Sequence, residues 1–195
     1  MDETRTWKKQ LSPEQATVKI RHYCAFQERT HQEVKVKLSS YGISWSDANQ
    51  IISSLIEEGF LNEERFAKAF VGGKFRMKGW GRKKIEMELK KRQVSSYSIQ
   101  KALREEIDPV AYEASLVKQM EKKWNSLKGP GNTIYVKQSK VRQYLLSKGF
   151  ENNIITKAIQ ALYGKNHIHN DTDGSPLGKQ KSKFGNAGEK DIGHF

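Results

Sequence analysis

The side chains best suited to chemistry in this chain are lysines and arginines, which attract acidic partners. The sequence has 35 Lys and Arg against 22 Asp and Glu, a net charge of +13. Between residues 74 and 92, nine Lys and Arg accompany two Glu, and between residues 122 and 149 seven Lys and Arg occur without any Asp or Glu. Such an excess indicates an acidic protein partner or nucleic-acid phosphates. Ordinary solvated helix faces are the competing interpretation, but an unopposed run of seven exceeds what solubility requires.

We predict that these two runs form a surface that binds a protein partner or DNA. Glu86 and Glu88 each lie four residues from a basic residue on either side, which predicts two ladders of ion pairs. Lys83 and Lys91 have no carboxylate at that spacing and are expected to be free. The predicted surface consists of Lys74, Arg76, Lys78, Arg82, Lys83, Lys84, Lys90, Lys91, Arg92, Lys137, Lys140, Arg142 and Lys148.

Few residues are spaced as enzymes or metal sites require. Residues 174–180 resemble a phosphate-binding loop, but one residue is missing between the glycines and Gln180 replaces the usual Ser or Thr. Residues 167–173 contain His and Asp, yet they lie in a polar segment without a scaffold to fix metal geometry. The single cysteine, Cys24, excludes an internal disulfide and a Cys-x-x-Cys metal site. We therefore expect no catalytic residue, no metal and no cofactor.

The elements that must position the basic residues are helices in a repeating pattern. First helices are predicted at residues 13–28, 62–76 and 109–127, and capping boxes are predicted at Ser12 and Thr30. Second and third helices align on apolar pairs spaced by four: Val34/Leu38, Ile85/Leu89 and Val141/Leu145, then Ile51/Leu55, Ile99/Leu103 and Ile155/Ile159. A single undivided bundle with coincidental spacing is the competing interpretation, but the shared offsets favour tandem units.

The sequence thus predicts an all-α fold in which three tandem three-helix repeats form an elongated, curved array. The repeats span residues 12–60, 61–107 and 108–163, between a flexible N-terminus (1–11) and a disordered tail (164–195) that is poor in apolar side chains. Each repeat is too small to bury a large core alone, so its stability should come partly from packing against neighbouring repeats. Gly72 and Gly73 are expected to weaken the first helix of the second repeat.

A pattern in residues 55–103 is specific in combination: LxxxGxLNEERFAxxFV, a basic linker with a Gly, RKKIxxEL and VxxxxIxxAL. With this pattern the chain resembles the RecX family over residues 18–163. Asn62 stands where the family often has Asp, and Gln93 stands where a Gly often ends the second helix. The central residues of the pattern are Gly59, Leu61, Arg65, Phe66, Ala67, Phe70, Val71, Gly81, Ile85 and Leu89.

The resemblance implies a non-enzymatic regulator of the RecA recombinase. Its expected partner is the RecA filament, with single- or double-stranded DNA phosphates as a further contact. We expect a cytoplasmic protein, because no stretch is apolar enough to span a membrane and the N-terminus has no apolar signal core. We also expect the protein to be a monomer. The alternative is a DNA-binding module similar to helix-turn-helix domains, although the predicted third helices carry few side chains suited to base contacts.

Overall fold

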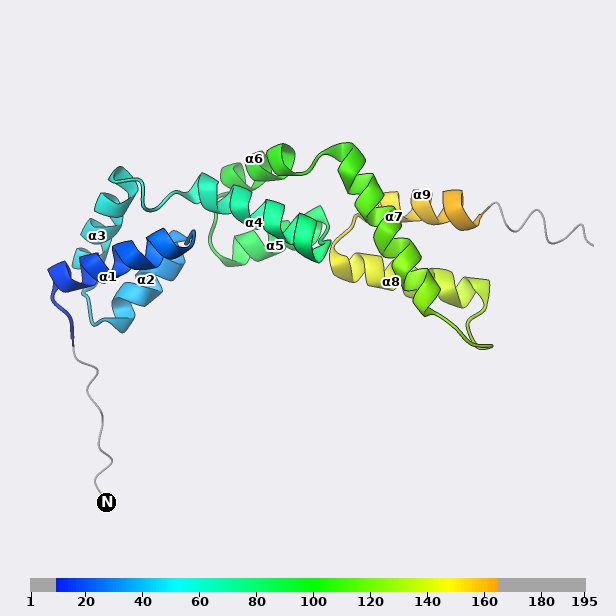
Figure 1. The fold of residues 1–195 in the computed structure, drawn as a ribbon, viewed down its shortest axis with the longest axis horizontal. Coiled ribbons are helices and arrows are strands. Elements are labelled where there is room, and N and C mark those ends of the chain that lie inside the picture. The colour runs from blue at the N-terminus through cyan, green and yellow to red at the C-terminus, as the bar shows by residue number, and fades with distance from the viewer. Residues whose placement is uncertain (1–9, 165–195) are drawn as a thin grey trace, which may run out of the picture.

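The computed structural model describes residues 10–164, and every regular element in that range is an α-helix. The helices are α1 (Pro13–Phe26), α2 (His31–Ser40), α3 (Trp45–Glu57), α4 (Glu63–Lys78), α5 (Arg82–Lys91), α6 (Ser96–Glu106), α7 (Pro109–Ser126), α8 (Ile134–Lys148) and α9 (Asn152–Tyr163). The predicted all-α fold of three-helix repeats is confirmed (Figure 1). We propose residues 12–60, 61–107 and 108–163 as the bounds of the first, second and third units. The predicted tail beyond Gly164 and residues 1–9 lie outside the described residues.

Hydrogen bonds hold the two residues that lie before Ser12 against the segment that follows α2. The Leu11 N–H donates to the Tyr41 carbonyl at 3.0 Å, and the Gln10 side chain donates to the Gly42 carbonyl at 2.8 Å. Gln10 and Leu11, at the end of the predicted flexible N-terminus (1–11), are therefore attached to the first unit.

The N-terminal caps explain where several helices begin. Ser12 and Gln15 exchange side-chain and backbone hydrogen bonds at the start of α1, and Thr30 and Glu33 do the same at α2. Both predicted capping boxes are thus confirmed. Helix α5 differs because its N-cap, Gly81, has no side chain to accept a hydrogen bond. The first N–H groups of α5 must therefore find partners elsewhere.

The apolar pairs that define the repeats are buried in all three units. The pairs of the second helices have exposed fractions of 0%: Val34, Leu38, Ile85, Leu89, Val141 and Leu145. The pairs of the third helices are also buried: Ile51, Leu55, Ile99, Leu103, Ile155 and Ile159. The spacing of apolar residues therefore predicted the inward faces of α2, α3, α5, α6, α8 and α9.

The units follow one another along an arch (Figure 1). Helices α2, α5 and α8 lie on its lower, concave side in this view, while α3, α6 and α9 lie on its upper side. Packing inside the units differs, because α4 packs mainly on α6 whereas α7 packs mainly on α8. Because α5 and α8 both lie on the lower side, the two basic second helices share the concave side of the arch.

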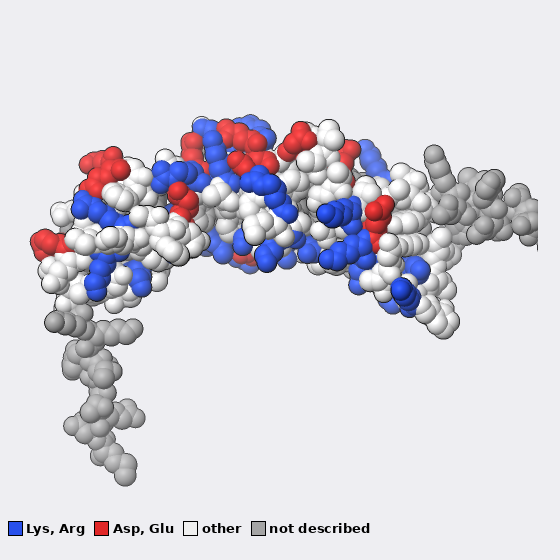
Figure 2. Space-filling model, in the orientation of Figure 1, with Lys and Arg blue, Asp and Glu red and all other residues white. Residues whose placement is uncertain are grey.

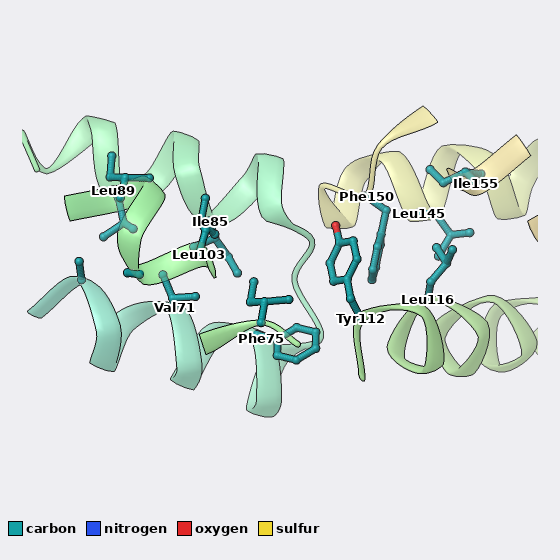
Figure 3. Packing of buried hydrophobic residues seen from close by; sticks show 14 of the residues in the cluster. Val71, Phe75, Ile85, Leu89, Leu103, Tyr112, Leu116, Leu145, Phe150 and Ile155 are labelled. Atoms are coloured by element: carbon teal, nitrogen blue, oxygen red, sulfur yellow. The ribbon is translucent and has the colours of Figure 1, made fainter. Parts of the chain in front are cut away.

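Buried side chains form two separate hydrophobic clusters. The first contains residues from Ala16 to Leu61, all of them in the first unit except Leu61. The second runs without a break through the second and third units (Figure 3). The rings of Phe75, Tyr112 and Phe150 join its two halves, with centroid distances of 6.0 Å and 5.2 Å between successive rings. The second and third units therefore share one core.

Helix α4 is continuous through Gly72 and Gly73, so the expected weak point does not interrupt it. The helix packs along α6, and tertiary packing of this kind outweighs the low helix propensity of glycine. Gly72 is buried, and the Arg76 and Glu106 side chains occupy the space that its Cβ would need. The small residue at this position thus leaves room for an ion pair between α4 and α6.

Candidate partner-binding surface

Five cationic side chains from three helices line one groove between the second and third units, which we call the basic groove. Its volume is about 650 Å³, and it lies between the C-terminal end of α4, the face of α7 and the end of α8. Among the described residues that line it, none is Asp or Glu. Clustered cations of this kind attract and hold polyanions or acidic protein surfaces. The five cations are Arg76, Lys78, Lys118, Lys122 and Lys148.

Helix ends and short hydrogen bonds fix the walls of the basic groove. Helix α4 ends at Gly79, which has a left-handed φ of 58°. The Tyr144 hydroxyl on α8 donates to the Gln119 side chain on α7 at 2.7 Å. The Lys148 ammonium donates to the Lys78 carbonyl at 3.3 Å. Because these contacts link α4, α7 and α8, the cations are presented from a fixed framework.

The sequence predicted three of the five cations, Arg76, Lys78 and Lys148, and missed Lys118 and Lys122. A signal for the missed pair was present in the spacing of the buried residues of α7. Tyr112, Leu116 and Met120 are buried at intervals of four, so Lys118 and Lys122 must lie on the opposite, exposed face. What the sequence did not reveal is that this face meets the end of α4.

Ion pairs on α5 differ from the predicted ladders. Lys90 pairs with Glu86 and Arg92 pairs with Glu88 at four residues' separation, as predicted. Lys91 also pairs with Glu88, at 3.0 Å, so the expectation that Lys91 is free is wrong. These hydrogen bonds from Lys91 and Arg92 lower the pKa of the Glu88 carboxyl. Pairs three residues apart are neighbours on a helix surface just as pairs four apart are, so a spacing of four alone does not predict this pair.

Two other basic residues of α5 turn toward the third unit instead of completing the ladders. The Arg82 guanidinium lies 4.1 Å from the centre of the Tyr112 ring. The Lys84 ammonium donates to the Ser147 carbonyl at 3.2 Å and lies 4.7 Å from the centre of the Trp80 ring. Both residues therefore hold units together. Lys83 is exposed and makes no ion pair with any residue in the described range 10–164.

The remaining predicted residues lie outside the basic groove. Lys74 and Arg92 flank the Phe70 ring, with distances of 5.1 Å and 5.0 Å to its centre. On α8, Lys137 lies 5.3 Å from the centre of the Trp124 ring. Lys140 donates to the Asn132 side chain at 2.9 Å, and Arg142 donates to the Asn152 side chain at 2.8 Å. The thirteen predicted residues are thus divided among a groove, a helix face and internal contacts.

A buried tyrosine stands at the boundary between the second and third units. The Tyr112 hydroxyl accepts a hydrogen bond from the Arg82 N–H at 3.0 Å and donates one to the Glu151 carboxylate at 2.7 Å. Burial raises the pKa of Tyr112 well above its ordinary value. The hydroxyl therefore stays protonated and acts as a structural link between α5, α7 and the start of α9.

The distribution of charge distinguishes the two sides of the arch. In Figure 2, Asp and Glu gather mainly along the upper edge, while Lys and Arg spread over the centre and the lower edge of the second and third units.

The described residues contain no group of three or more His, Cys, Asp or Glu placed to hold a metal ion. The segment with His and Asp at residues 167–173 and the segment at residues 174–180 that resembles a phosphate-binding loop lie outside the described range. No helix between residues 10 and 164 has the length and apolar character needed to cross a bilayer.

Comparison with known proteins places this fold in a family. Residues 62–103 match the family model described as RecX, second three-helix domain, and residues 111–159 match RecX, third three-helix domain. The crystal structure of RecX from Lactobacillus salivarius superposes with a TM-score of 0.66 at 30% identity, covering 77% of this chain and 96% of that chain. The chain belongs to the RecX family. The matched RecX domains correspond to α4–α6 and to α7–α9.

Other RecX proteins extend the comparison. The regulatory protein RecX of Clostridium perfringens is 28% identical over 72% of this chain and 65% of its own length. That of Caldanaerobacter subterraneus subsp. tengcongensis is 33% identical over 67% of this chain and 61% of its own length. A second RecX crystal structure shares the fold, with a TM-score of 0.69 at 18% identity over 75% of this chain and 72% of that chain. The regulatory proteins RecX of two Lactococcus lactis subspecies, cremoris and lactis, match over 52% and 56% of their own lengths. The chain therefore spans between about half and two thirds of these curated relatives.

Proposed function

We propose that this protein binds RecA recombinase filaments on DNA and modulates their assembly and activity in recombination and repair. Membership of the RecX family, whose named members are regulatory proteins, supports the regulatory role. The basic groove carries the argument for the partner, because five cations meet there without a lining carboxylate. A nucleoprotein filament presents phosphates and acidic protein surface to such a groove.

The proposed action requires no catalysis. A regulator shifts a filament between growing and disassembling states only by binding one state more tightly than the other. The arch of units with α5 and α8 on its concave side suits contact with several subunits of a filament at once. We propose that a monomer makes these contacts through the basic groove and the exposed Lys83 of α5.

The decisive test reverses Lys118 and Lys122, two of the four groove cations that form no ion pair with a described carboxylate. The double variant Lys118→Glu and Lys122→Glu should weaken binding to RecA filaments on single-stranded DNA by about tenfold or more, because it places negative charge in the groove. Binding should also depend less steeply on salt. The matched control is Lys19→Glu with Lys157→Glu, which changes net charge equally at exposed positions outside the groove.

The functional readout is the DNA-dependent ATPase of RecA and the length of its filaments, measured with substoichiometric amounts of this protein. We expect the native chain and the control variant to change both quantities and the groove variant to change neither. Equal effects of the groove variant and the control on affinity, salt dependence and ATPase would remove the basic groove from the mechanism.

Direct DNA binding without the recombinase is the second candidate. The absence of a lining carboxylate in the basic groove favours it, because phosphates bind to clustered Lys and Arg. The third helices argue against base recognition. On α6, Lys101 pairs with Glu64 and Glu105 pairs with Lys68, so these side chains are engaged within the unit. Filter binding of DNA alone separates the two functions, since strong and sequence-dependent affinity would favour this one.

A further inference from the structure

An apolar groove lies at the junction of the first and second units. This groove, which we call the α1–α4 groove, has a volume of about 360 Å³ and is lined by α4 and by the residues that follow α1. Phe66, Phe70, Gly73 and Met77 recur every three or four residues along α4 and form its floor. Met77 is 82% exposed, and nearby Phe26 at the end of α1 is 86% exposed. Large apolar side chains gathered in this way mark a surface that a partner covers.

Gly73 gives the α1–α4 groove its depth. A Cβ at this position would meet no heavy atom within 4 Å, so neither close packing nor a turn requires glycine there. Glycine is also the poorest helix former after proline, and Gly73 lies inside α4. The neighbouring Gly72, by contrast, makes room for Arg76 and Glu106. The space above Gly73 is therefore open to a side chain from another molecule.

The charge around the α1–α4 groove is positive. Lys74 and Lys78 line it, and neither makes an ion pair with any residue between 10 and 164. The Arg92 guanidinium, which pairs with Glu88, lies 5.0 Å from the centre of the Phe70 ring. The single lining carboxylate, Glu28, is already paired with Arg65. An occupant would therefore combine an apolar side chain with flanking carboxylates.

We propose that the α1–α4 groove binds an acidic peptide segment of a partner protein, which inserts a Phe, Leu or Met side chain over Gly73. The aliphatic and aromatic floor buries this anchor, while Lys74 and Lys78 contact carboxylates on either side of it. This site adjoins the basic groove, with which it shares Met77 and Lys78, but its floor of Phe66, Phe70 and Gly73 belongs to it alone. The proposal requires neither a recombinase nor DNA.

The test begins with random peptides displayed on phage and selected on the full chain. Enriched peptides should combine a Phe, Leu or Met with several Asp or Glu. Fluorescence anisotropy with these peptides should show binding that weakens as salt rises. The variant Gly73→Met fills the groove with a good helix former, so its Tm should rise while peptide affinity falls at least about tenfold.

A matched control is Gly131→Met, because a Cβ at Gly131 also meets no heavy atom within 4 Å and the residue lies between α7 and α8. It should bind the peptides like the native chain, and Lys74→Glu with Lys78→Glu should bind them less. Equal binding by Gly73→Met, or enriched peptides that lack either acidic residues or an anchor, would overturn the proposal. So would a dimer seen by sedimentation that Gly73→Met abolishes, because the occupant would then be a second copy. No recombinase or DNA is present, so this test and the filament test fail independently.

Discussion

The two junctions between units are built differently, although the units share one pattern. Between the second and third units, the first N–H groups of α5 donate to the third unit. Gly81 N–H bonds the Lys148 carbonyl at 2.8 Å, and Lys83 N–H bonds the Gly149 carbonyl at 3.1 Å. Arg82 N–H bonds the Tyr112 hydroxyl at 3.0 Å. Helix α8 thus ends on the start of α5, with the dipoles of the two helices in line.

Between the first and second units, no backbone hydrogen bond joins the corresponding positions of the described chain. The repeat offsets align Gly81 with Thr30 and Gly149 with Gln93. Thr30 and Glu33 satisfy the start of α2 within the first unit through their capping box. Here the units are linked by the loop before α4 and by Arg65, which pairs with Glu28 and donates to the Gly59 carbonyl at 3.0 Å. The hydrophobic clusters on the two sides of this junction remain separate.

Two glycines account for much of this difference. A Cβ on Gly81 would collide with the backbone of Gly149 and Phe150, and a Cβ on Gly149 would collide with the backbone of Lys84. Backbones can approach closely only where side chains are absent. We infer that the second and third units act as one body, while the first unit is attached through an exposed ion pair and a loop.

The largest effect is expected from Gly149→Ala. Alanine at a φ of 88° is strained, and its Cβ also meets Lys84, so the free energy of unfolding should fall by about 2–5 kcal/mol. Urea unfolding monitored by circular dichroism measures this. The matched control is Gly59→Ala, which has a φ of 75° but no heavy atom within 4 Å of the added Cβ. It should cost only about 1–2 kcal/mol; equal losses would show that close approach at the junction is unimportant.

A smaller effect is expected from Tyr112→Phe. This change leaves the Arg82 N–H and the Glu151 carboxylate without the hydroxyl that now bonds both. The free energy of unfolding should fall by about 1–3 kcal/mol, the usual cost of an unsatisfied buried polar group. Tyr97→Phe serves as control, because Tyr97 is 65% exposed and its hydroxyl is not at the junction. A Tyr112→Phe variant as stable as this control would contradict the proposed link.

The smallest effect, and one of opposite sign, is expected from Gln93→Gly. Gln93 has a φ of 58°, the left-handed conformation that Gly42 and Gly149 adopt at the aligned positions. Glycine removes this strain, although it loses more backbone conformational entropy on folding than glutamine does. The free energy of unfolding should therefore rise by about 1 kcal/mol. Calorimetry should show a higher Tm. Gln100→Gly, on the exposed face of α6, should lower Tm instead. A lower Tm for Gln93→Gly would mean that the side chain at this position contributes more than its strain costs.

Sequence patterns predicted most of the fold but only part of the candidate site. Caps such as Ser12 and apolar pairs such as Ile85 and Leu89 act within one or two turns of helix. Short stretches of sequence therefore predict where a helix begins and which of its faces is buried. The basic groove required more, because Arg76 and Lys118 come from helices whose relative placement no local pattern reveals. Lys84 was predicted to be on the partner surface, yet its ammonium bonds a carbonyl of α8.

The sequence by itself determined that this chain forms short helices in repeated groups of three with an excess of positive charge. Helix starts, helix ends and buried faces depend on residues only a few positions away, so the amino-acid sequence is enough to predict them. Tertiary structure alone decided that the second and third units share a core and that α4 stays helical through Gly72 and Gly73. It also decided which cations face outward together. These outcomes depend on contacts between distant segments, where burial and close packing outweigh local propensity.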